Sequence, residues 1–180
     1  MDNEYTGSWL STQHIEKFHF LNPSIDEIDI RDIAHALSLT CRFGGHCSKF
    51  YSVAEHSCRV SGVVPLEYAL AALLHDSGEA YVPDIPSPIK VICPELTRIE
   101  ENIRGVIFKK FNVECKDYSV IKKADMSLLM SEADLLGLNT KSWYLNDTKR
   151  VLVPQEGIGW TPERAESVFL EIFELTYGGK

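Results

Sequence analysis

The chain has 180 residues, a length that suits one domain with a single hydrophobic core. Hydrophobic residues make up 44% of it and charged residues 24%, as in ordinary globular proteins, and the formal net charge is −8. This acidic balance argues against a nucleic-acid polymer as partner, because phosphate backbones are bound by basic surfaces. A small anionic ligand stays compatible with the composition if a few lysines and arginines converge.

The lengths of the apolar runs and the pattern of the cysteines indicate the cellular compartment in which the protein is expected. No apolar run reaches the length of a membrane span, and the polar first residues, MDNEYTGSWLSTQ, lack the apolar core of a secretory signal. The five cysteines form no CxxC pair, so we expect reduced thiols and no cysteine-based zinc site. We therefore expect a cytoplasmic protein with no membrane partner.

The N-terminal segment reads as irregular or as a hairpin. Extended pieces are predicted over 9–13 and 17–21, followed by a turn at 22–24. From Asp29 onward, apolar residues recur every three or four positions. This spacing predicts a helix that ends at the glycine pair beginning at Gly44.

The middle of the chain continues in helices. Ser52 followed by Glu55 resembles a capping box and opens a helix over 52–64. The stretch 66–80 is apolar on nearly all sides and is predicted to be the central helix. Three prolines follow within 82–90, a segment that cannot continue a helix.

The last third predicts a long connection between helices. Residues 139–160 form this connection, with a short hairpin as an option around 149–157. Thr161 as N-cap and Pro162 in the first turn mark the start of the last helix. The predicted helices of this part are 95–111, 118–138 and 161–177. The predicted fold is therefore all-α, one compact domain of five or six helices behind a short N-terminal segment.

Four ionisable residues stand out: His56, His75, Asp76 and Asp125. His75 and Asp76 follow the apolar run ALAALL, where ionisable side chains are costly unless their charge is compensated. Asp125 interrupts another apolar-faced helix, and His56 lies on the helix before His75. Singly, each could be a surface histidine or a helix cap. Together, two imidazoles and two carboxylates from three helices predict a site for one divalent transition metal, with room for water.

The order of these residues, with the stretches EHS, LLHDSGEAY and DIPSPIK, resembles the HD superfamily of metal-dependent phosphohydrolases over about 29–138. The chain is most similar to the small bacterial HD-domain 5′-deoxynucleotidases and to the phage HD-domain dATP triphosphohydrolases. The resemblance implies a single HD-type domain over 1–180 in a bacterial or phage-infected cytosol. It also implies a homo-oligomer.

The same resemblance assigns roles to the acidic and basic residues. It makes His56, His75, Asp76 and Asp125 the ligands of one metal ion per chain, with Zn²⁺, Co²⁺ or Mn²⁺ favoured and Mg²⁺ an option at the phosphates. Glu79 matches the glutamate that orients water or acts as acid and base. Spacing agrees, because Glu79 lies about one helical turn past His75. The second active-site acid in the resemblance is Asp84.

Substrate contacts are expected from the residues around these acids. The resemblance places Lys90 near the phosphates and Arg42 with Phe43 beside the sugar, although each could also be surface or core. Lys122 precedes Asp125 by three residues on the same helical face, where it reaches an outer phosphate or only solvent. His46 is either a phosphate donor or a loop residue.

The resemblance implies an enzyme that hydrolyses deoxynucleotides. The favoured activity is a dNTP triphosphohydrolase that prefers dATP and releases deoxynucleoside and triphosphate. The alternative within the resemblance is a 5′-deoxynucleotidase that acts on dNMPs, since both reactions cleave the same bond. Two alternatives of other classes are a non-catalytic nucleotide-binding module and a helical domain with a structural metal.

Overall fold

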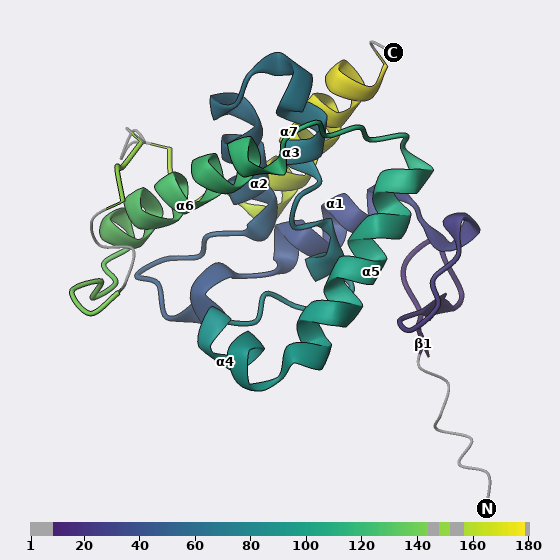
Figure 1. Ribbon diagram of the computed structural model, residues 1–180, viewed down its shortest axis with the longest axis horizontal. Coiled ribbons are helices and arrows are strands. Elements are labelled where there is room, and N and C mark those ends of the chain that lie inside the picture. Colours follow the sequence, from purple (N-terminus) through teal and green to yellow (C-terminus); the bar gives the residue numbers. More distant parts are fainter. Residues whose placement is uncertain (1–8, 144–147, 152–156, 179–180) are drawn as a thin grey trace, which may run out of the picture.

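The computed structural model describes residues 9–143, 148–151 and 157–178. In this part of the chain, seven α-helices and one two-stranded sheet make up the regular structure (Figure 1). The helices are α1 Ile30–Leu39, α2 Val53–Val63, α3 Ala69–Leu73, α4 Ser87–Ile92, α5 Pro94–Lys110, α6 Tyr118–Leu135 and α7 Pro162–Tyr177. The predicted all-α class is confirmed, and α4 is a helix that the sequence pattern did not indicate.

The N-terminal segment forms the expected hairpin. Strands β1 (Trp9–Leu10) and β2 (Phe18–His19) pair antiparallel, with Trp9 opposite His19. Phe18 is fully buried and stacks on Tyr81, with their ring centroids 3.7 Å apart. The hairpin is therefore fastened to the segment that follows the predicted His-Asp pair.

The core forms where α7 packs against α1, α2 and α3. In Figure 1 these four helices lie between α6 on one side and α5 on the other. Fully buried side chains from each of them meet in one cluster, which includes Leu37, Val53, Leu73 and Phe169. Each large apolar side chain removed from water in this way contributes roughly 1.5–3 kcal/mol. This packing gives α2 and the end of α3 a rigid frame.

Helix α1 ends at Leu39, so the prediction that it continues to the glycine pair at Gly44 is wrong. Thr40 accepts a hydrogen bond from the amide of Val53 at 3.0 Å, and the Arg42 amide donates to Tyr51 at 2.9 Å. Residues 40–42 are therefore drawn into pairing with 51–53, a non-local contact that local helical periodicity does not reveal.

Helix α3 is much shorter than the predicted 66–80. His75 Nδ1 donates to the carbonyl of Ala72 at 2.7 Å, and Ser77 Oγ donates to the carbonyl of Leu74 at 2.7 Å. These side chains take carbonyls that backbone amides would bind in a continuing helix. The chain turns after Leu73, and a 3₁₀ turn follows over Ser77–Ala80.

Two further boundaries differ from expectation. Helix α4 begins at Ser87 inside the proline-rich segment, because a proline in the first turn leaves no hydrogen bond unmade. Helix α6 ends at Leu135, three residues early, and Gly137 then adopts a left-handed φ of 77°. The hairpin suggested around 149–157 falls mostly outside the described residues. No described helix is both long and apolar enough to cross a membrane.

Candidate metal centre

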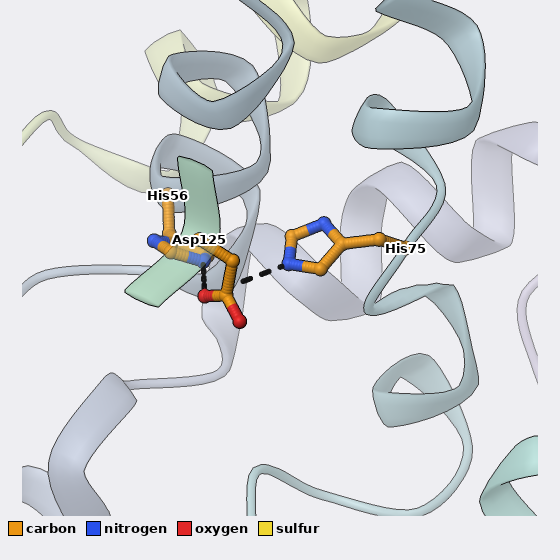
Figure 2. Close-up of side chains that lie close together, drawn as sticks. All are labelled: His56, His75 and Asp125. Carbon is orange, nitrogen blue, oxygen red and sulfur yellow. Dashed lines mark hydrogen bonds and ion pairs between the residues drawn. The ribbon is translucent and has the colours of Figure 1, made fainter. Parts of the chain in front are cut away.

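Three of the four predicted ligands meet in space. His56 extends from α2, Asp125 from α6, and His75 from the turn after α3 (Figure 2). Asp125 Oδ1 lies 3.1 Å from His56 Nε2 and 3.9 Å from His75 Nε2. One potential ligand atom from each residue lies within 4.8 Å of the others, so this group could hold a metal ion.

Asp76, the fourth predicted ligand, lies beside the same group. Its Oδ2 is 3.1 Å from His75 Nε2 and 3.8 Å from His56 Nε2. Burial opposes ionisation of this carboxyl, but the two imidazoles and the guanidinium of Arg42 outweigh it and hold the pKa of Asp76 well below its usual range. The carboxylate therefore stays charged and able to coordinate a cation.

The hydrogen bonding of His75 tests whether the group suits a metal. A carbonyl only accepts, so Nδ1 carries the proton that it donates to Ala72, and in the neutral ring Nε2 is the nitrogen with the lone pair. This Nε2 is buried and faces the carboxylates of Asp76, 3.1 Å away, and Asp125, 3.9 Å away. Two imidazoles with carboxylates form a donor set that suits a divalent transition metal, which could bind between this nitrogen and the carboxylates.

His56 is fully buried, and each of its two ring nitrogens contacts a carboxylate that fixes the orientation of the ring. Its Nδ1 lies 2.8 Å from Glu132 Oε1, while its Nε2 faces Asp125. Burial and the charge of Arg42 act to lower the pKa of His56, but the carboxylates of Glu132 and Asp125 outweigh them and raise it to about 9. A metal ion at Nε2 must therefore displace a proton at neutral pH.

Glu132 is the functional candidate that the sequence reasoning missed. It is fully buried on α6 and lies seven residues, or two helical turns, after Asp125. Besides His56, it accepts a hydrogen bond from the hydroxyl of Tyr51 at 2.7 Å. An acidic residue two turns beyond a predicted ligand, inside the apolar stretch LLMSEADLL, was the signal that could have found it.

Glu79 lies in the 3₁₀ turn next to the cluster and is buried. Its Oε1 lies 3.2 Å from Lys90 Nζ, and the same Nζ lies 2.6 Å from Glu100 Oε2. Burial, then the charges of Asp76 and Asp84, raise the pKa of Glu79 well above its usual value, and Lys90 opposes them only in part. Lys90, expected at the phosphates, is thus held between two carboxylates. Glu100 was not predicted.

The turn that carries Arg42 and Phe43 faces the same acids. Arg42 is buried, with Nη1 3.5 Å from Asp76 Oδ2, so it is not a surface charge. It begins a 3₁₀ turn and does not close a helix as predicted. Phe43 has a left-handed φ of 59°, which is strained for a non-glycine residue, and its amide donates to Asp84 Oδ2 at 3.2 Å. Asp84 therefore fastens this turn to the site.

Two predicted substrate residues stand apart from this network. His46 and Lys122 are both exposed. Neither side chain makes a hydrogen bond or ion pair to the four predicted ligands within the described residues. Lys122 lies one turn before Asp125 on α6. Their phosphate contacts stay predictions.

Comparison with known proteins identifies relatives. No family model matches the chain. The Escherichia coli (strain K12) protein YfdR is 42% identical over 137 residues, which cover 76% of this chain and 77% of YfdR. A protein of Rhodobacter capsulatus is 28% identical over 127 residues, or 65% of each chain. Neither relative has a name that states an activity, so the functional argument depends on the site.

Proposed function

This chain belongs to the family of Escherichia coli YfdR, and we propose that it is a metal-dependent phosphohydrolase of the HD type that acts on deoxynucleotides. The observation that carries the proposal is the gathering of two buried imidazoles and two carboxylates, in which His75 Nε2 lies 3.1 Å from Asp76 Oδ2 and 3.9 Å from Asp125 Oδ1, beside the ring of His56. Ligand atoms of His56, His75 and Asp125 lie within 4.8 Å of one another, close enough for one cation to contact all three. This convergence of nitrogen and oxygen donors supports an exogenous metal ion.

His56, His75, Asp76 and Asp125 would hold one divalent metal ion. Such an ion, when bound, lowers the pKa of water from about 15.7 to near 7 and polarises a phosphoryl oxygen. The protein must add a group that moves protons and groups that balance phosphate charge. Both kinds of group lie around the cluster.

Glu79 would move the proton. Its raised pKa lets the carboxyl exchange a proton nearer to neutral pH than an ordinary glutamate does. It would accept a proton from the attacking water and return it to the departing 5′-oxygen of the sugar. The charge of Lys90, 3.2 Å from Glu79 Oε1, opposes this rise in pKa.

Arg42 would bind the phosphate that is attacked. Its guanidinium lies within 3.5 Å of a proposed metal ligand, Asp76, and its side chain is confined by burial. A confined guanidinium suits developing negative charge on phosphoryl oxygens, because little reorganisation is needed during the reaction. Phe43, on the same turn, would pack against the sugar or base.

The favoured substrate is dATP, hydrolysed to deoxyadenosine and triphosphate, with dNMP hydrolysis as the alternative. The test uses protein stripped of metal and reloaded separately with Zn²⁺, Co²⁺, Mn²⁺ or Mg²⁺. Each form is incubated with the four dNTPs and with dAMP, and chromatography quantifies nucleoside, triphosphate and phosphate. Deoxyadenosine with triphosphate supports the first activity, and phosphate from dAMP alone supports the second.

Binding of dATP without turnover under every metal would favour a non-catalytic nucleotide module. Absence of both binding and turnover would contradict the proposal.

We also propose a homo-oligomer, since α4 exposes the apolar side chains of Val91 and Ile92, which a subunit interface would cover. Light scattering at micromolar concentration tests this, and a monomeric mass would contradict it.

A further inference from the structure

Glu132 is a buried carboxylate that connects two parts of the candidate site. Its exposed fraction is 0%, and a buried carboxylate is costly unless charged or hydrogen-bonding partners compensate it. Its partners are His56 and Tyr51, through hydrogen bonds, and Arg42, whose Nε lies 3.6 Å from Glu132 Oε2. One of these partners is a proposed metal ligand, and another is the proposed phosphate-binding arginine.

The contact with His56 determines which ring nitrogen is free for a metal. The carboxylate oxygen of Glu132 that accepts from the Tyr51 hydroxyl lies 2.8 Å from His56 Nδ1, and since a carboxylate oxygen accepts, this Nδ1 carries the proton between them. In the neutral ring, Nε2 then keeps the lone pair that faces Asp125, 3.1 Å away. A carboxylate behind a ligating histidine also raises the basicity of that histidine.

The contact with Arg42 acts on the other half of the site. Its Nε lies at an ion-pair distance from Glu132, beyond hydrogen-bonding range, while Nη1 lies 3.5 Å from Asp76 Oδ2. The guanidinium is therefore held between a carboxylate behind the site and a proposed ligand within it. Without the rear carboxylate, Arg42 would be attracted to Asp84 and to the proposed ligands Asp76 and Asp125, so that it would compete with a metal ion for Asp76.

We propose that Glu132 is a positioning residue that orients His56 for metal binding and, at the same time, holds Arg42 for phosphate binding. This inference rests on the proposed metal-dependent function. It predicts that one substitution at Glu132 weakens the affinity for the metal ion and the affinity for the phosphate group, although Glu132 contacts neither.

The test is Glu132→Gln, which keeps the volume and removes the charge. Metal-free protein is titrated with Co²⁺ and followed by visible absorption. We expect the affinity to fall about 10–100-fold, as for other changes behind metal-ligating histidines. Affinity for inorganic triphosphate should fall roughly tenfold or more, as for loss of a charged interaction. The matched control is Tyr51→Phe, which deletes one hydroxyl from the same carboxylate and leaves His56 and Arg42 paired.

Tyr51→Phe should lower both affinities less than Glu132→Gln does, because it leaves the charged carboxylate facing His56 and Arg42. Glu132→Asp, which retains the charge, should recover part of both. Folding of each variant is checked by circular dichroism. Wild-type affinities in folded Glu132→Gln would overturn the inference. If wild-type protein itself binds no Co²⁺, the proposed function fails with it.

A second measurement needs no variant, should Glu132→Gln not fold. Nitrogen-15 spectra of the histidines in Zn²⁺-loaded wild-type protein report which nitrogen of His56 carries the proton. A protonated Nδ1 supports the inference. A protonated Nε2 would overturn it, because Glu132 would then not direct that nitrogen to the metal.

Discussion

Replacing Glu79 with glutamine tests the proposed proton transfer with little change in shape. Glutamine has nearly the same size, so the packing of the buried side chain is kept, but it cannot exchange the proton. Lys90 would still be neutralised by Glu100, whose Oε2 lies 2.6 Å from its Nζ. The variant should therefore fold and bind metal as wild type does.

The expected loss follows from the role of Glu79. Removing a general acid or base costs roughly 10²–10⁴-fold in rate. At about 1.36 kcal/mol per tenfold, that is on the order of 3–5 kcal/mol of transition-state stabilisation. The loss should fall on kcat, while KM changes little, because the proton moves only in the transition state.

The assay is steady-state kinetics on dATP and dAMP, with metal content measured in every preparation. The matched control is Glu101→Gln, an exposed glutamate on α5, which should keep wild-type kinetics. Turnover equal to wild type in metal-loaded Glu79→Gln would remove Glu79 from the mechanism. If the loss of turnover in Glu79→Gln is explained entirely by a lower metal content, a role of Glu79 in proton transfer would also be refuted.

Three further changes probe the same region. Gly78→Ala places a Cβ 2.8 Å from the backbone oxygen of Glu100, so thermal unfolding should show a loss of roughly 1–3 kcal/mol; an unchanged melting temperature would contradict this contact. Because the pKa of His56 is raised to about 9 without metal, metal binding at neutral pH releases a proton. The affinity for Zn²⁺ should therefore rise by up to about tenfold per pH unit from pH 7 toward 9. Calorimetry that shows a constant affinity over this range would contradict proton release from His56. Lys90→Ala removes a charge that lowers the pKa of Glu79, so the acidic limb of the pH profile of kcat/KM should move to higher pH. In the same variant, KM should rise more for dATP than for dAMP. An acidic limb at the wild-type pH would show that Lys90 does not influence the titration of Glu79.

Local signals in the sequence were enough for several elements. The N-cap side chains of Ser52 and Thr161 accept hydrogen bonds from amides three residues on, and the helices they open match the predicted ones. The grouping of His56, His75 and Asp125, which could hold a metal ion, was predicted because ionisable residues within apolar helical stretches need a compensating partner. These features depend on residues close together in the chain or on residue type alone.

The features that the sequence did not reveal depend on contacts between distant segments. Helix α1 ends early because residues 40–42 pair with 51–53, and no helix-breaking residue marks that point. The partners of Lys90 lie on two other segments, so its position between Glu79 and Glu100 was not visible. Glu132 was missed because its spacing from Asp125 also fits an ordinary exposed glutamate on a helix.

The central claim is that His56, His75, Asp76 and Asp125 bind one divalent metal ion. Elemental analysis of purified wild-type protein and Asp76→Ala protein, each dialysed against the same trace of Zn²⁺, tests it most directly. The account predicts about one transition-metal ion per wild-type chain and a small fraction of that in Asp76→Ala. Full occupancy in a folded Asp76→Ala protein, or no retained metal in wild type, would contradict it.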